Sequence, residues 1–316
     1  MAAVPRRSRR PPSGRAGRRG SRIGCGPVDT GAPDPSFPAV TAEAPLQRFK
    51  LSLHYDGTGF HGWQIQAAER TVQGDLEAAL ARLTGARRPV VGSGRTDAGV
   101  HAVGQVASVD LPPRWTAGEL RRALNAVLPG DVWVAEARTV PRDFHPRYHA
   151  TRRTYVYRLG LEPEAHGPFY RRRCWPVEEE VDEEHLDAAA AALPGSRSFQ
   201  AFAKAGQPER GYHCTVEEAG WKGWSLGRQL RITADRYLHH MVRYLVGTMV
   251  DVARGRRPME EMEALLHHPS GPERTSPPAP PQGLFLARVE YPPQVEPPSP
   301  DGQVAGVDPR SRPFLP

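Results

Sequence analysis

The sequence predicts an α+β protein in which two similar halves share one broad sheet of mixed or antiparallel strands, with helices on one face and a central cleft between the halves. Two observations predict this fold. Apolar residues alternate with a period of two in some stretches and recur every three or four residues in others, which are the repeats of strands and of amphipathic helices. These stretches follow one order, strand-helix-strand-strand-helix-strand, in each half of the 316 residues.

The first half carries the clearer pattern. Phe49, Leu51 and Leu53 alternate with polar residues as in a half-buried strand, and Thr116 and Glu119 form the T-x-x-E box that opens a helix. The expected elements are a strand at 49–55, a helix at 72–83, short strands at 90–91 and 103–109, a helix at 116–127 and a strand at 132–140. This is the order of the ferredoxin-like split β-α-β unit.

The second half repeats the order of elements with little sequence identity. The expected elements are a strand at 154–159, a helix at 182–193, strands near 215–221 and 229–234, helices at 237–254 and 259–267, and a strand at 284–290. We therefore expect one α/β unit over residues 47–145 and another over residues 146–292, joined through the edges of their sheets.

The basic character of the chain belongs to one end. Residues 1–22 hold eight arginines and no acid, and removing these eight from the 42 basic residues leaves 34 against 35 acidic ones, so the net charge falls from +7 to −1. Residues 1–46 and the Pro-rich residues 293–316 are predicted to be disordered. The first tail is a solvated leader or a start codon assigned too early, an RNA-contacting arm, or a transit peptide, although its prolines oppose an amphipathic helix.

Several classes of protein are excluded by what the sequence lacks. No apolar run approaches the length of a membrane span. Cys25, Cys174 and Cys214 form no metal spacing and no disulfide framework, which fits a reducing cytoplasm. The phosphate-binding G-x-x-x-x-G-K-[ST] motif does not occur.

The glycine-rich stretch GSGRTDAGVHAVGQV, residues 92–106, is the first candidate for chemistry. Glycines tolerate positive φ and allow close approach, so they can display Asp97 on a tight turn. Arg95 is close enough in sequence to keep a partly buried carboxylate ionised, as a nucleophile or base requires. The alternative is an aspartate that only caps its own turn.

Two further stretches combine glycine or arginine with aromatic residues. YDGTGFHGWQ, residues 55–64, is either a functional turn or a turn with packed aromatics. In RRTYVY, residues 152–157, Tyr155 and Tyr157 share one strand face, where they either stack on bases or join the core.

The last candidate is HHMVRYLVG, residues 239–247. His239 and Arg243 would share one side of a helix at spacing i, i+4. Adjacent histidines on a helix point about 100° apart, and no third ligand is evident near His240, so we expect no metal site.

These stretches together resemble the tRNA pseudouridine synthase A (TruA) family. The resemblance spans about 245 residues and rests on ordered blocks: YDGTGFHGWQIQ, TVQGDLEAAL, GRTDAGVHA, LNAVLPGDVWV, DFHPRYHATRRTYVYRL, HHMVRYLVGTMVDVARG and APPQGLFLARVEYP. It implies a homodimer that binds tRNA across both subunits, in the cleft, and converts uridines 38, 39 and 40 of the anticodon arm to pseudouridine without metal or organic cofactor.

The resemblance also implies a role for individual residues. Asp97 matches the catalytic aspartate, Tyr155 the tyrosine that packs against the target uracil, Arg243 an arginine that pairs with the catalytic carboxylate, and Arg95 one that holds the target nucleotide open. The reaction breaks the N1–C1′ bond, turns the uracil and rejoins it through C5, so the base must leave its stack. The sequence leaves open whether Asp97 attacks C1′, adds to C6 or removes a proton from C2′.

This chain departs from the family pattern at three places, which puts local RNA contacts in doubt. Ile65 stands where an arginine is common, and Tyr244 where an asparagine is usual. Before the strand at Val216 the family pattern has a threonine or an arginine, and here the residues are GYHC, 211–214. Two rival functions remain at this point: a non-catalytic RNA-binding protein, and a pseudouridine synthase that acts on other positions or other RNAs.

Overall fold

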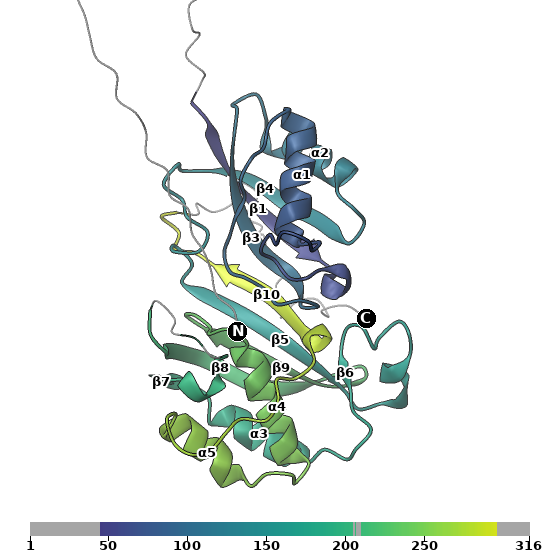
Figure 1. The fold of residues 1–316 in the computed structure, drawn as a ribbon, viewed down its shortest axis with the longest axis vertical. Helices are drawn as coiled ribbons and strands as arrows, with labels where there is room; N and C mark the ends of the chain where they lie inside the picture. Colours follow the sequence, from purple (N-terminus) through teal and green to yellow (C-terminus); the bar gives the residue numbers. More distant parts are fainter. Residues whose placement is uncertain (1–44, 205, 207–209, 296–316) are drawn as a thin grey trace, which may run out of the picture. The chain divides into compact units, whose positions relative to one another are not determined.

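The computed structural model describes residues 45–204, 206 and 210–295 (Figure 1). The two predicted tails lie outside the described residues, apart from residues 45–46 and 293–295. Among the described residues, no helix combines the length and the apolar character needed to cross a membrane.

The first half has the predicted order of elements. Its elements are β1 (Gln47–Tyr55), the 3-10 turn η1 (Gly57–Gly59), α1 (Val72–Thr84), β2 (Val91–Gly92), β3 (His101–Leu111), α2 (Ala117–Val127) and β4 (Val132–Val140). The predicted capping box opens α2: the Thr116 hydroxyl accepts from the Glu119 N–H, and the Glu119 carboxylate accepts from the Thr116 N–H.

The second half adds short elements that the sequence analysis did not predict. Its elements are β5 (Arg152–Gly160), η2 (Pro163–His166), β6 (Trp175–Pro176), α3 (Glu183–Ala191), β7 (Gly195–Ser198), η3 (Gln200–Phe202), β8 (His213–Trp224), β9 (Gly227–Ala234), α4 (Met241–Ala253), α5 (Met259–His267), η4 (Pro281–Gly283) and β10 (Leu284–Glu290). Strands β6 and β7 have two and four residues, too short to show alternation.

One sheet runs through both halves, in the order β4-β1-β3-β10-β5-β9-β8-β7. Strand β2 pairs with β3, so the first half has the order β4-β1-β3-β2, and the second half has the same order in β10-β5-β9-β8. The two halves are therefore ferredoxin-like copies in one mostly antiparallel sheet, which confirms the predicted α+β class. That residues 47–145 and 146–292 are separate domains stays a prediction.

The halves join where β10 pairs with β3, in parallel, at Phe285–His101 and Leu286–Ala102. Strand β2 is only two residues long and pairs nearer the C-terminal end of β3, at Ser108 and Ala107. Because β2 stops early, the rest of that edge of β3 is open to a strand from the other half. Gly104 fits this joint because a Cβ there would lie 2.2 Å from the carbonyl oxygen of Ala287.

Helices α1 and α2 cover the first half of the sheet and α3, α4 and α5 the second, in two hydrophobic cores (Figure 1). Each core also takes residues from the other half: Leu286 and Val289 of β10 lie in the first core and Val100 in the second. Tyr155 packs against both. The halves are thus joined by shared packing as well as by strand pairing.

We predict that Gly104→Ala lowers the free energy of unfolding by about 2 kcal/mol or more, because the new methyl group must push β3 away from the β10 backbone. Gly220→Ala is the matched control, since Gly220 also lies in a strand, but a Cβ placed there would meet no atom within 4 Å. Urea unfolding of both variants measures the difference. Equal stability of the two variants would mean that the joint tolerates a side chain.

Candidate active site

The glycine-rich loop leaves the sheet where β2 ends and returns at His101. Ser93 fixes its start, because its N–H donates to Val106 O at 2.7 Å and its hydroxyl contacts Gln105 Oε1 at 2.7 Å. Its end is closed by a turn from Val100 N to Asp97 O, with Gly99 at φ 77°. The turn conformation explains the need for glycine here.

The turn of residues 55–64 supports this loop. Trp63 N donates to Thr96 O at 3.0 Å, and Gly99 N donates to Phe60 O at 3.2 Å. The Thr96 hydroxyl shares a 2.8 Å hydrogen bond with the Tyr55 hydroxyl. Both Phe60 and Trp63 are buried. The aromatics of this stretch are packed, as one interpretation expected, and its backbone also holds the residues around Asp97. That the turn itself takes part in function stays a prediction.

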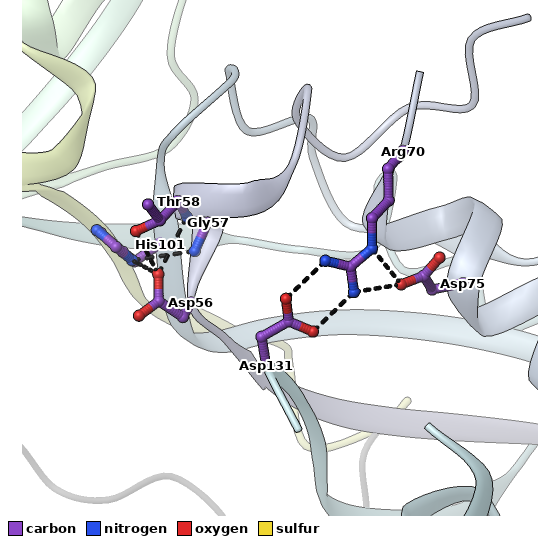
Figure 2. A network of polar contacts seen from close by, with 7 residues as sticks. All are labelled: Asp56, Gly57, Thr58, Arg70, Asp75, His101 and Asp131. Carbon is purple, nitrogen blue, oxygen red and sulfur yellow. Dashed lines mark hydrogen bonds and ion pairs between the residues drawn. The ribbon is translucent and has the colours of Figure 1, made fainter. Parts of the chain in front are cut away.

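Arg70 fixes the other side of that turn (Figure 2). Its guanidinium donates to both carboxylate oxygens of Asp131, at 2.7 and 2.8 Å, and to Asp75 at the start of α1. It also lies over the ring of Phe60, with 4.1 Å between the guanidinium carbon and the ring centre. One side chain thus ties the turn to β4 and to α1.

Arg153 of β5 holds the loop from the second half. One terminal nitrogen donates to Ser93 O at 3.1 Å and to Arg147 O at 2.8 Å, and the other donates to Asp235 O at 2.9 Å. Burial lowers the pKa of this guanidinium from its usual value. The sequence analysis missed this role of Arg153; its place inside RRTYVY was the only available signal.

Three side chains from the second half of the chain lie against the carboxylate of Asp97. Arg243 of α4 places its NH1 3.3 Å from Oδ2, and its Nε donates to Ala279 O at 2.7 Å, which fixes the guanidinium. His240 Nε2 lies 3.3 Å from the same oxygen, and His239 Nε2 lies 3.5 Å from Oδ1. The predicted pair of Asp97 and Arg243 is therefore in contact across 146 residues of sequence.

The expected start of the last long helix at residue 237 is wrong. Helix α4 begins at Met241, and His240 is its N-cap residue in the left-handed conformation, with φ 64°. The expectation that adjacent histidines diverge by about 100° assumed a helix at both positions. Because the backbone turns at His240 instead, both imidazoles face Asp97.

Asp97, His239 and His240 offer ligand atoms that all lie within 4.8 Å of one another, a set that could hold a metal ion. Arg243 contacts the same carboxylate and would oppose a cation there by charge. Burial lowers the pKa of His240, with the Asp97 charge acting in the opposite direction. The expectation that no metal takes part stays a prediction.

Tyr155 lies between the two cores, with its ring edge to face against Tyr237 at 4.9 Å. Burial raises the pKa of its hydroxyl to about 12, although the positive charge of Arg153 opposes this shift. Arg95 is separate from this group: its side chain is exposed and has no ion pair or hydrogen bond with any described residue.

We predict that His240→Gly is more stable than His240→Ala by about 1 kcal/mol, because only glycine adopts a left-handed conformation without strain. His239 has no positive φ, so there alanine is expected to be more stable than glycine by about 0.5 kcal/mol. Thermal and urea unfolding of the four variants test this reversal of order. The same order at both positions would contradict the left-handed turn.

A family model described as tRNA pseudouridine synthase matches residues 51–149 and 189–292. Asp97 and Arg243 lie inside these ranges, and Tyr155 lies in the segment between them.

Curated relatives match most of the chain and most of their own length. Proteins named tRNA pseudouridine synthase A from Methylacidiphilum infernorum and Moorella thermoacetica are each 41% identical, over 249 and 244 residues, which is 78% and 77% of this chain and 97% and 98% of the relatives. The protein of that name from Solidesulfovibrio magneticus is 42% identical over 260 residues, 78% of this chain and 92% of the relative. This chain belongs to the tRNA pseudouridine synthase family.

Proposed function

We propose that this protein isomerises uridine to pseudouridine at positions 38, 39 and 40 in the anticodon arm of tRNA, with Asp97 as the catalytic carboxylate. The contact between Asp97 and Arg243 carries the proposal, because a carboxylate held by a guanidinium at the joint of two halves is suited to act on a substrate between them.

The two carboxylate oxygens of Asp97 have different surroundings, and this supports different roles for them in the reaction. Oδ2 faces both Arg243 and His240, and the Asp97 side chain is only 18% exposed. Oδ1 faces His239, whose side chain is 59% exposed. We infer that Oδ1 is the oxygen that reaches the sugar or base of the target uridine, while Oδ2 stays bound to the protein.

Tyr155 supplies an aromatic ring where the two cores meet. A tyrosine hydroxyl is uncharged at neutral pH, and burial makes its ionisation still harder. We propose that Tyr155 acts by packing its ring against the extruded uracil. A uracil freed from C1′ must stay in place while it turns, and a ring contact can hold it there. Arg95, exposed and unpaired among the described residues, is the proposed contact that keeps the target nucleotide open.

The remaining details of the proposal come from the family resemblance. They are a homodimer that binds tRNA across both subunits, a location in the cytoplasm, and a choice of the anticodon arm over other parts of the tRNA. The relatives named above support tRNA as the substrate class by their names.

The first test uses a tRNA transcript labelled with tritium at C5 of uridine and measures the tritium released into water. Forming the C5–C1′ bond expels the C5 hydrogen, so the native protein is expected to release tritium into water. Asp97→Asn keeps the shape of the side chain but loses its charge, and release is expected to fall by about 10³-fold or more. Release by both proteins would rule out Asp97 as the catalytic group. Binding without release by either would indicate a non-catalytic RNA-binding protein.

Arg243→Ala is expected to slow turnover much more than it weakens tRNA binding, because Arg243 touches the catalytic carboxylate. Arg256→Ala is the control: this arginine lies just beyond the same helix, and its partners are Glu179 and Asp251. Single-turnover rates and dissociation constants should be measured for both. Equal losses of rate and affinity in Arg243→Ala would make it a binding residue instead.

A further inference from the structure

The connection between β5 and β6 presents an exposed aromatic ring beside three consecutive arginines. Its sequence is GPFYRRR, residues 167–173, and it lies between the two ranges that match the family model. Phe169 is 82% exposed, the highest value among the exposed large apolar side chains of the described residues. A single exposed ring is common on protein surfaces, so the neighbouring groups decide what this one does.

Hydrogen bonds hold this loop in one shape. Tyr170 N and Arg171 N both donate to Gly167 O, and Arg173 N donates to Tyr170 O at 2.7 Å. The Sγ of buried Cys174 lies 3.3 Å from the same Tyr170 O. The exposed ring therefore projects from a tightly turned segment, which lowers the entropy lost when a partner binds it.

His101 connects this loop to the glycine-rich loop. Its Nε2 lies 2.8 Å from Arg172 O and must be the donor, since a carbonyl only accepts. Its Nδ1 faces the Gly57 N–H at 3.0 Å and Asp56 Oδ1 at 3.3 Å (Figure 2). The imidazole is 2% exposed and stacks on Phe285 at 4.7 Å. The histidine that ends the glycine-rich loop thus anchors the arginine loop directly.

A cavity of about 570 Å³ lies against the loop. Its lining residues include Arg171, Arg172 and His166, together with Thr58 and Gly99. Arg173 is paired with Asp56 at 3.5 Å, but Arg171 and Arg172 have no ion pair or side-chain hydrogen bond with any residue that the structure describes. Two arginines that line one cavity, with no ion pair to any described residue, are suited to an anion, and above all to phosphate, whose geometry matches the paired N–H groups of a guanidinium.

The geometry points to a second RNA-binding site beside the catalytic aspartate: we propose that Arg171 and Arg172 bind backbone phosphates of the tRNA, and that Phe169 stacks on an unpaired base next to the target uridine. Proteins commonly hold single-stranded RNA by two kinds of contact: cationic side chains that bind the phosphates and aromatic rings on which the bases stack. This inference rests on the tRNA pseudouridine synthase function proposed above and names how that substrate is held.

The position of the cavity supports this assignment. Gly99 lines it and is two residues from Asp97, so their Cα atoms are at most about 7 Å apart. Enzymes that extrude a base also contact the nucleotides that flank it. An anion held in this cavity would therefore lie close to the backbone of the loop that carries Asp97, as the proposed flanking phosphate requires.

The arginines are tested by the double variant Arg171→Gln/Arg172→Gln in the full-length protein. We expect the dissociation constant for an unmodified tRNA transcript to rise at least about tenfold. The slope of its logarithm against the logarithm of salt concentration is expected to fall by about 1 to 2, for two lost phosphate contacts. The loss is expected mainly in affinity, so the single-turnover rate at saturating tRNA falls by less than the affinity does.

Arg82→Gln/Lys222→Gln is the matched control. It also removes two exposed cations, from α1 and β8, and neither has an ion pair among the described residues. This variant is expected to bind tRNA with unchanged affinity and salt slope. If both double variants lose affinity equally, the effect is bulk charge and the site is refuted. A native affinity and slope in Arg171→Gln/Arg172→Gln would refute it as well.

Phe169 is tested by a series of substitutions that distinguishes the effect of aromatic stacking from the effect of apolar volume. Phe169→Ala and Phe169→Leu are expected to weaken tRNA binding by about tenfold, while Phe169→Trp keeps native affinity because its ring also stacks. Full affinity in Phe169→Leu would show that no base stacks there. A change in oligomeric state in Phe169→Ala, with tRNA affinity unchanged, would make the loop a protein interface and overturn the proposal.

The failure of this inference can be told apart from failure of the proposed function. Tritium release from tRNA by the native protein, abolished in Asp97→Asn, supports the reaction whatever the loop does. If release is native in rate and in dependence on tRNA concentration for both the arginine double variant and Phe169→Ala, the loop proposal alone is wrong. Absence of release by the native protein would remove the function on which the loop proposal rests.

Discussion

The parallel pairing of β10 with β3 holds the two halves of this protein together and fixes their relation. Strand β10, the last strand among the described residues, must lie beside a strand from the first half, and this requires a residue without a Cβ at position 104, where the Ala287 backbone comes close. The pairing extends one sheet across both halves and lets β10 supply side chains to the first core. Together with the packing that the two cores share, this pairing sets the geometry of the residues around Asp97, which come from both halves.

The early end of β2 has two consequences. It leaves an edge of β3 open for β10, and it releases the chain from the sheet so that residues 93–100 can form a loop. Side chains of the loop anchor it in part, through the hydroxyls of Ser93 and Thr96. Neighbouring segments add hydrogen bonds to its backbone: the turn of residues 55–64 from one side and Arg153 from the other. The site is thus built on backbone contacts to rigid elements, which suits a carboxylate that must be held in one orientation.

Charge at this site is arranged asymmetrically. Arg243, fixed by Ala279 O, and His240, fixed by the left-handed turn before α4, both face Oδ2 of Asp97. A second group of cations, Arg171 and Arg172, lines the cavity at Gly99 and is unpaired among the described residues. The chain has a net charge near zero once the arginines of residues 1–22 are removed, so RNA binding by the rest of it depends on such local groups and not on bulk charge.

Local patterns in the sequence were enough to predict the α+β class, the repeated order of elements, the approximate positions of the main helices and strands, and the family. These follow from periodic burial and from motifs, which need only neighbouring residues. The same patterns could not locate the start of α4, because a single left-handed residue at His240 leaves no periodic trace. Nor could they reveal the anchoring role of Arg153, the convergence of both histidines on Asp97, or the cavity beside Arg171 and Arg172. Each of these depends on contacts between segments far apart in sequence, which arise only when the two halves pack against each other.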